Sequence, residues 1–326
     1  MKPFIVAEMS ANHLGSLKRA LDIVEVAAAA GADGLKVQTW TPGRMCVSKD
    51  VVLQHGPWAG RHLADLYEEA FLPWEWHRPI FDRARALGLV PFSAAFDWEA
   101  VDFLETLGVD RHKVASFELT DLPLIRYMAG KGKPMILSTG MATEKEIDEA
   151  VLAADNGLPR TLLKCTSAYP APMDSMNLRA LRDMDEQFPA YVGLSDHTLG
   201  HIAPVVATAL GATYIEKHLT LSRADGGPDA GFSMEPQEFA NMVGAVRRTV
   251  AALGEVRYGP QPGEDPSLRR SLWVLRDIHA GEPLRFGDNV VTARPARGLP
   301  CDTQLAGRRA AVAIKAGTAL QQEHLA

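Results

Sequence analysis

The amino-acid sequence predicts an α/β fold, a (β/α)8 barrel (TIM barrel) followed by a small β-rich domain. Two observations predict the barrel. Short apolar runs recur eight times, mostly alternating with helical patterns, and polar residues follow the end of almost every run. Eight such units in about 250 residues match the size of this fold. A third observation is the accumulation of glycine and proline after residue 254. We therefore expect a barrel at residues 1–253, a linker at 254–270 and a second domain at 271–326.

The expected strands are short apolar runs of the kind found in buried parallel sheets. In chain order they are residues 4–7, 34–37, 89–93, 113–116, 134–137, 161–163, 191–194 and 212–215. Helical spacing marks residues 17–30, 74–87, 98–107, 122–130, 143–154 and 202–210, and one more helix at 236–253. Local signals support these bounds: Gly31 ends the first helix, Pro73 precedes the second, and Thr143 is an expected N-cap. Residues 39–72 are irregular, and long loops in compact domains are often functional.

A doubly wound open sheet is the alternative, and counting strands does not exclude it. The placement of polar residues favours the barrel, because the carboxyl ends of all barrel strands converge on one mouth, where such enzymes keep their chemistry. The polar residues at or near strand ends are Glu8, Lys36, Ser93, Ser116, Glu118, Ser138, Ser167, Ser195, His197, Glu216 and His218.

The C-terminal domain consists of short β-type runs and turns, with little helical periodicity. A domain of about 55 residues is marginally stable by itself. We therefore expect it to pack on the barrel or on a partner subunit.

Composition excludes several classes of protein. The 326 residues are 47% hydrophobic and carry a formal net charge of −6, which argues against nucleic acid or an anionic membrane surface as partners. The apolar stretch at the start of the sequence is too short, and polar residues follow it too soon, for a signal peptide. No run of about 18 uncharged apolar residues is present. Cys46, Cys165 and Cys301 show neither a disulfide framework nor metal-ligand spacing. A cytoplasmic protein is expected.

Two histidines follow the last two expected strands. Ser195-Asp196-His197 and Glu216-Lys217-His218 each end a run, and a crossover helix between the runs makes the strands parallel. His197 and His218 should then emerge side by side on one rim, where two neutral imidazoles can share a divalent metal ion. The alternative is that both are satisfied by local hydrogen bonds.

Three lysines near strand ends, Lys36, Lys113 and Lys164, favour an anionic substrate. With the hydroxyls of Ser116, Ser138, Thr139 and Ser195 they offer donors for a phosphate. Glu8 and Glu118 can act as general bases or bind sugar hydroxyls. The alternative is that they pair with the same lysines. The loop after His218 presents Asp225 and Asp229 around a Gly-Gly-Pro turn and is a candidate for substrate binding.

These motifs together resemble the sialic acid synthase family. The matching segments run through the whole barrel and include AEMSANHLGSLKRAL, LKVQT, HKVASFEL, GKPMILSTGMAT, LLKCTSAYPAP, VGLSDHTLG, IEKHLTL and GGPDAGFSMEP. The tail segments RRSLWVLRDIHAGEPL and ARPARGLP resemble the family's SAF (antifreeze-like) domain. The resemblance implies synthesis of a nine-carbon keto acid from phosphoenolpyruvate and an acetamido sugar, with C–O cleavage and phosphate release.

Within the family, WAGRHLADLYEEAFLPWEWHRPIF, FELTDLPLIRYMA and the DGGPD loop resemble the pseudaminic acid synthase branch. The implied acceptor is 2,4-diacetamido-2,4,6-trideoxy-L-altrose. The alternative is the N-acetylneuraminic or legionaminic branch, with the same mechanism and a different sugar. Two rival functions remain beside the resemblance: a Schiff-base aldolase that uses a rim lysine, and a non-catalytic carbohydrate-binding protein.

The resemblance also implies roles for single residues. Mn²⁺ or Mg²⁺ is implied at His197 and His218, and Glu118, Glu8 and Lys113 are implied as catalytic. Phosphoenolpyruvate is implied to bind Lys36, Lys113, Ser116, Ser138, Ser167 and Ser195, and the sugar Gln38, Tyr169, Asp229 and Arg294. The family pattern makes the protein a homodimer in which the SAF domain brings Arg294 to the neighbouring barrel, with Arg297 as the alternative arginine. One departure concerns strand three, where Ser93-Ala94-Ala95 stands in place of the usual Ser/Thr-Pro pair, and Ser93 is the expected substitute.

Overall fold

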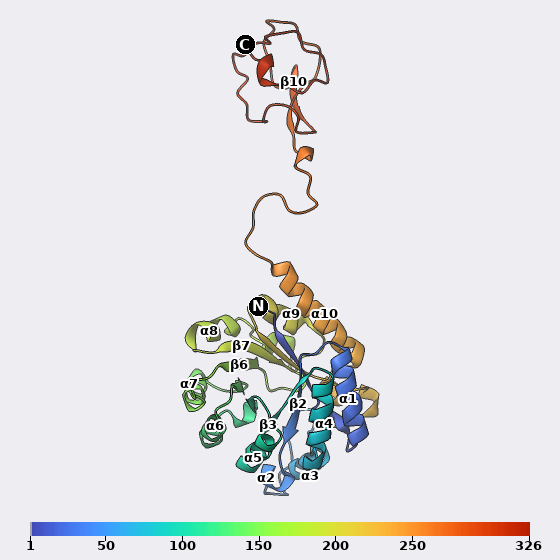
Figure 1. Ribbon diagram of the computed structural model, residues 1–326, viewed down its shortest axis with the longest axis vertical. Helices are drawn as coiled ribbons and strands as arrows, with labels where there is room; N and C mark the ends of the chain where they lie inside the picture. The colour runs from blue at the N-terminus through green and yellow to red at the C-terminus, as the bar shows by residue number, and fades with distance from the viewer. Residues whose placement is uncertain (1) are drawn as a thin grey trace. The chain divides into compact units, whose positions relative to one another are not determined.

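The computed structural model describes residues 2–326, and eight parallel strands form a closed barrel in chain order (Figure 1). The strands are β1 (Phe4–Glu8), β2 (Gly34–Thr39), β3 (Val90–Ala95), β4 (His112–Val114), β5 (Met135–Ser138), β6 (Arg160–Cys165), β7 (Tyr191–Asp196) and β8 (Tyr214–His218). The barrel closes between β8 and β1, where Phe4 pairs with Tyr214 and Glu8 with His218. The predicted barrel is therefore confirmed, and the open-sheet alternative is wrong.

Helices surround the barrel (Figure 1). They are α1 (Leu17–Ala29), α2 (Pro42–Met45), α3 (Leu63–Ala70), α4 (Trp74–Ala86), α5 (Trp98–Thr106), α6 (Leu122–Ala129), α7 (Glu144–Ala153), α8 (Ala180–Gln187), α9 (Ile202–Ala209) and α10 (Pro236–Leu253). The predicted N-cap of α7 is confirmed, because Thr143 and Glu146 form a reciprocal capping box. The sequence analysis missed α8, a short and mostly polar helix of eight residues that buries only Leu181 and Met184.

Strand alternation divides the buried side chains into two cores. One alternate set of strand residues packs outward against the helices and belongs to the larger core. The inward set fills the part of the barrel farther from the carboxyl ends of the strands with Val6, Phe92, Ile136, Leu163 and Tyr214. Gly193 contributes backbone alone there, because a Cβ would lie 2.6 Å from Tyr214. Toward the carboxyl ends of the strands this apolar filling gives way to charged side chains, which form the floor of the site.

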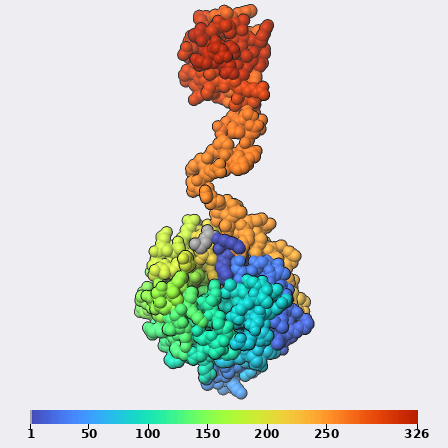
Figure 2. Space-filling view, viewed as in Figure 1, coloured from blue at the N-terminus to red at the C-terminus, as the bar shows by residue number. Residues whose placement is uncertain are grey.

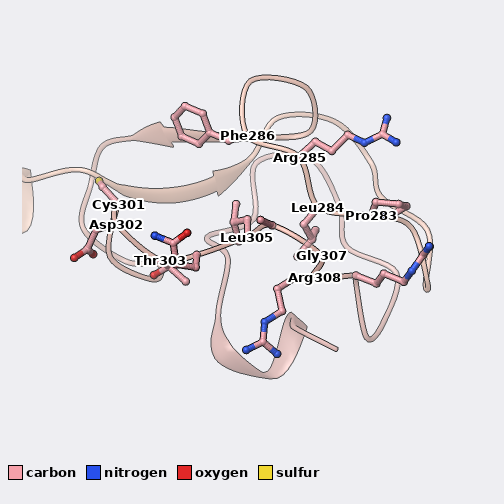
Figure 3. A pocket seen from close by; sticks show the side chains of 13 residues that line it. Pro283, Leu284, Arg285, Phe286, Cys301, Asp302, Thr303, Leu305, Gly307 and Arg308 are labelled. Carbon is pink, nitrogen blue, oxygen red and sulfur yellow. The ribbon is translucent and has the colours of Figure 1, made fainter.

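The chain divides after Gly254 into two compact units, the second being Glu255–Ala326. Residues 255–270 are exposed throughout, and the residues after them form one compact body, drawn in red in Figure 2. That body contains an antiparallel pair, β9 (Ser271–Val274) and β10 (Val290–Ala293), and its own apolar core. A surface hollow of about 680 Å³ lies between residues 283–286 and 301–309 (Figure 3). It contains none of the residues predicted for the site.

Among residues 2–326, no helix combines the length and the apolar character that crossing a lipid bilayer requires.

Candidate active site

A pocket of about 410 Å³ lies at the carboxyl ends of the barrel strands. Eleven residues predicted for the site line it: Lys36, Gln38, Lys113, Ser116, Glu118, Ser138, Tyr169, Ser195, His197, His218 and Asp229. They come from β2, β4, β5, β7 and β8 and from the loops that follow the strands. The barrel thus gathers residues that lie as far as about 190 positions apart in sequence, as expected of a barrel mouth.

A buried ionic cluster forms the floor of the pocket. Lys36 Nζ lies 2.9 Å from Glu216 Oε1 and 3.3 Å from Glu8 Oε2, and all three side chains are nearly inaccessible. Burial alone would lower the pKa of Lys36, but the charges of Glu216 and Glu8 outweigh it and raise that pKa. Burial raises the pKa of Glu8 to about 7, although Lys36 opposes this. Glu8 is thus ion-paired with Lys36, and Lys36 remains a cation.

Lys113 provides the second ammonium group of the pocket. Its Nζ donates to Ser138 Oγ at 2.7 Å and to the carbonyl of Val114 at 2.8 Å, and the residue is 1% exposed. Burial lowers the pKa of Lys113 to about 8, against the opposing charge of Glu216. Nearby, Ser116 Oγ lies 2.8 Å from the hydroxyl of Ser167. Two ammonium groups and several hydroxyls in one buried site can hold a phosphate and a carboxylate.

Glu118 follows β4 in the short 3-10 helix η2 (Ser116–Glu118) and faces the pocket. Burial raises its pKa to about 7, although Lys113 lowers it. Its Oε2 is buried and has no hydrogen-bond partner within the described chain. A carboxyl group that titrates near neutral pH beside a buried ammonium group can exchange a proton with water or a bound molecule.

The two predicted histidines lie together, with ring centroids 5.4 Å apart. His197 Nδ1 lies 2.9 Å from the carbonyl of Thr166, so this nitrogen donates and leaves Nε2 with a free lone pair. Burial lowers the pKa of His218 well below its usual value, so its imidazole is neutral, and its Nδ1 has no partner among residues 2–326. Burial alone would lower the pKa of His197, but the contacts with Cys165 and the Thr166 carbonyl outweigh it and raise that pKa. In their neutral forms two imidazoles in one pocket fit a shared divalent metal ion. The described residues form no group of three or more acidic, histidine or cysteine ligands, so water and substrate would complete the coordination.

A buried ion pair lies behind the histidines. Asp196 and Lys217 precede them on β7 and β8, and alternation turns both side chains to the outside of the barrel. Lys217 Nζ lies 2.6 Å from Asp196 Oδ2, and both side chains have zero exposure. This pair joins the two strands at the point where the histidines leave them.

A further polar part of the pocket centres on Asp229. Asp229 accepts hydrogen bonds from Ser10 Oγ and, at 3.3 Å, from the backbone N–H of Ala11. Ser10 has φ 46°, a left-handed conformation that residues other than glycine seldom adopt. The centroid of the Tyr169 ring lies 4.4 Å from that of His197, which places an aromatic ring beside the histidine pair.

Four predicted residues do not line the pocket. Ser93 faces outward, because the neighbouring Phe92 lies in the inner core and the next inward position is Ala94; its hydroxyl bonds to Thr39 Oγ1 at 2.6 Å and to the carbonyl of Val37. Ser93 therefore does not supply a hydroxyl group to the pocket, contrary to the expectation from the sequence. Glu8 and Ser167 lie just behind the lining and touch it through Lys36 and Ser116. Arg294 is exposed and belongs to the second unit.

Sequence reasoning missed several lining residues and included one rim lysine too many. Lys164 is turned away, with its Nζ on the carbonyl of Cys165, while Cys165 lines the pocket. Glu216 could have been found, because it shares the strand parity of His218. The segment between β2 and α4 also contributes apolar residues that the sequence analysis did not identify, although the helical spacing of those in α3 was a usable signal. They are Trp40, Met45, Leu53, Trp58, Leu63, Leu66, Tyr67 and Ala70.

Comparisons with known proteins agree with this architecture. The NeuB family profile matches residues 23–258 and the SAF domain profile residues 269–326. The pseudaminic acid synthase of Campylobacter jejuni serotype O:2 is 40% identical over 98% of this chain and 96% of its own length. The N,N'-diacetyllegionaminic acid synthase of Legionella pneumophila is 34% identical over 100% and 95%. The crystal structure of the N-acetylneuraminic acid synthetase of Leptospira borgpetersenii superposes with a TM-score of 0.74 at 30% identity, covering 81% of this chain and 89% of that one.

Proposed function

This chain belongs to the NeuB family of sialic acid synthases, and we propose that it is a pseudaminic acid synthase, a transferase that forms a C–C bond. Its substrates are phosphoenolpyruvate and 2,4-diacetamido-2,4,6-trideoxy-L-altrose. The observation that carries the proposal is the joint placement of two buried ammonium groups, a near-neutral carboxyl and a histidine pair in one pocket. The higher identity to a pseudaminic than to a legionaminic acid synthase supports the choice of sugar.

Phosphoenolpyruvate binds between the two lysines. Lys113, held by Ser138, and Lys36 neutralise its phosphate and carboxylate, and Ser116, with Ser167 behind it, donates hydroxyl hydrogen bonds. Ser195 completes this set, with its hydroxyl 3.3 Å from Glu216 Oε1. Fixed donors in a buried site stabilise the charge that remains on phosphate as it leaves.

The reaction forms one C–C bond and breaks one C–O bond. C3 of phosphoenolpyruvate attacks the aldehyde carbon of the open-chain sugar, the aldehyde oxygen takes up a proton and becomes a hydroxyl group, and positive charge develops at C2. Water adds at C2 and gives a proton to Glu118, whose pKa near 7 suits this transfer. The tetrahedral intermediate then collapses to the 2-keto acid and expels phosphate together with the bridging oxygen. Glu8 beside Lys36 is a second site for a proton.

His197 and His218 would hold the divalent metal, Mn²⁺ or Mg²⁺. Such an ion supplies Lewis-acid polarisation of the aldehyde oxygen. Gln38, Tyr169 and Asp229 line the same pocket and bind the sugar. The hydroxyl and carboxylate groups of this set suit the polar face of an acetamido sugar.

The proposal includes a homodimer in which the SAF domain of one subunit serves the barrel of the other. Arg294 is the residue that would reach the neighbouring sugar. Its exposure in the second unit leaves it free to do so. We propose a cytoplasmic location for the protein, because phosphoenolpyruvate is produced in the cytoplasm.

Phosphate release from phosphoenolpyruvate tests the proposed function. Wild-type protein is assayed with Mn²⁺ and one of three acceptors: the L-altro sugar, its D-manno isomer and N-acetylmannosamine, each with and without EDTA. We expect fast release with the L-altro sugar, abolished by EDTA. Preference for another acceptor would move the protein to the legionaminic or sialic branch, and release that survives EDTA would contradict the metal proposal.

A matched pair of variants ties the activity to this pocket. Lys113→Met removes a lining ammonium group on β4, whereas Lys164→Met removes a lysine on β6 whose side chain faces away from the pocket. Lys113→Met should abolish phosphate release, and Lys164→Met should leave it unchanged. Trapping of a substrate by borohydride on either lysine would instead support the Schiff-base aldolase.

A further inference from the structure

One side of the pocket is an apolar wall made by a single chain segment. We define the wall as Trp40, Leu53, Trp58, Leu63, Leu66 and Tyr67, all of which line the pocket. They belong to the irregular segment between β2 and α4, which also contains α2 and α3. Trp40 and Leu66 are buried, and the other four are half-buried. None of these residues is needed for phosphate binding or for the metal.

The wall is anchored at both ends. The Trp58 indole N–H donates to the carbonyl of Pro228 at 2.8 Å, which ties the segment to the loop after β8. Trp40 packs edge-on against Phe96, with ring centroids 5.3 Å apart, and its carbonyl accepts from Trp74 Nε1 at 3.0 Å. Such contacts fix the apolar surface before any substrate arrives, as specificity requires.

The wall continues to the histidine pair through aromatic rings. The Trp58 ring lies 5.3 Å from Tyr169 and 6.2 Å from Phe232, and Phe232 lies 5.0 Å from His218. A sugar whose aldehyde lies at the histidines therefore has its remaining carbons available for contact with the wall.

We propose that the apolar wall is the subsite for the methyl groups of the acceptor, the 6-deoxy methyl and the acetamido methyls, and that it selects against 6-hydroxy sugars. This inference rests on the proposed function. The wall suits methyl groups because the Trp58 N–H is already bound to Pro228. Trp40 Nε1 is buried without a partner among residues 2–326, which matches the carbonyl oxygen of an acetamido group.

Selection follows from the cost of leaving a hydroxyl group without partners. A 6-hydroxyl placed against the aliphatic side chains of the wall, such as Leu53 and Leu63, loses water and finds no hydrogen-bond partner there to replace it. Pockets of this type discriminate between such close analogues by about 10- to 100-fold. The expected preference of kcat/KM for the 6-deoxy sugar over its 6-hydroxy analogue is therefore about 100-fold at most.

The test compares kcat/KM for the L-altro acceptor and for the same sugar carrying a 6-hydroxyl group. Wild-type protein should prefer the 6-deoxy sugar by at least about tenfold. Leu63→Ser and Trp58→Ala should each lower that ratio several-fold, chiefly by raising KM for the 6-deoxy sugar. Val47→Ser is the matched control, because Val47 lies in the same segment, is 88% exposed and does not line the pocket. Its ratio should equal that of the wild type.

A binding measurement separates the two levels of the proposal. Saturation-transfer NMR of the acceptor, without phosphoenolpyruvate, should show stronger transfer to methyl than to ring protons, and Leu63→Ser should reduce it. If both wall variants release phosphate with an unchanged kcat/KM ratio between the 6-deoxy and 6-hydroxy sugars, the methyl subsite is overturned and the proposed function stands. No release with any acceptor would overturn the proposed function itself, and this inference with it.

Discussion

The buried pair Asp196–Lys217 should position the two histidines, and Lys217→Met tests this. The pair is 2.6 Å apart, has zero side-chain exposure and joins β7 to β8 directly behind His197 and His218. Removing one partner of a buried ion pair costs about 3–5 kcal/mol, because the other charge stays buried. In a unit of this size each kcal/mol lowers Tm by about 2–4 °C, so the expected fall is roughly 6–20 °C.

Two readouts distinguish positioning from stability. Calorimetry gives Tm, and electron paramagnetic resonance of free Mn²⁺ gives the Kd of the metal. Changes in groups that orient metal ligands cost about 10- to 100-fold in metal affinity, and we expect about tenfold for Lys217→Met. The double variant Asp196→Asn/Lys217→Met removes both charges and should regain most of the lost Tm without regaining the metal affinity.

A control variant sharpens the result. Lys133→Met breaks an ion pair with Glu105 in which both side chains remain partly exposed, and neither residue lines the pocket. It should lower Tm slightly and leave the Kd of Mn²⁺ unchanged. If Lys217→Met lowers Tm but binds Mn²⁺ as tightly as the wild type, the pair supports the fold alone and the positioning argument fails.

Three further outcomes are expected. The pH profile of kcat/KM for phosphoenolpyruvate should be bell-shaped. It should fall below about pH 7 as Glu118 takes up a proton and above about pH 8 as Lys113 loses its charge; an unchanged acid limb in Glu118→Gln would exclude that assignment. Ser93→Ala should lower stability by about 1 kcal/mol through its lost hydrogen bonds and leave KM for phosphoenolpyruvate unchanged; a raised KM would return Ser93 to the site. Mixing the inactive variants Lys113→Met and Arg294→Ala should restore about a quarter of wild-type activity, since half of randomly formed dimers contain one intact site; no recovery would place Arg294 in its own subunit's site.

The barrel could be predicted because each of its signals is local. Apolar runs, helix caps and polar strand ends are read within a few residues, and their eightfold recurrence left few folds to choose from. His197 and His218 were predicted as neighbours for the same reason, since a short crossover between two strands fixes their relative direction.

What failed was the parity of single strands. Whether Ser93 or Ala94 faces inward depends on how β3 pairs with its neighbours, and a shift of one residue exchanges the two faces. The same ambiguity placed Lys164 on the rim and left Cys165 out of it. The apolar wall was beyond prediction for another reason. Leu63, Leu66 and Tyr67 have helical spacing in α3, but Trp40, Leu53 and Trp58 lie outside any helix or strand. How these two groups meet depends on long-range packing of the segment.

The most direct test of the synthase chemistry follows the bridging oxygen of phosphoenolpyruvate. The substrate is labelled with ¹⁸O between C2 and phosphorus and converted with the L-altro acceptor and Mn²⁺, and both products are analysed by mass spectrometry. Cleavage of the C–O bond predicts that the label leaves with phosphate and that the 2-keto acid contains none of it. Label retained in the keto acid would mean cleavage of the P–O bond, and would contradict the mechanism built on Lys36, Lys113 and Glu118.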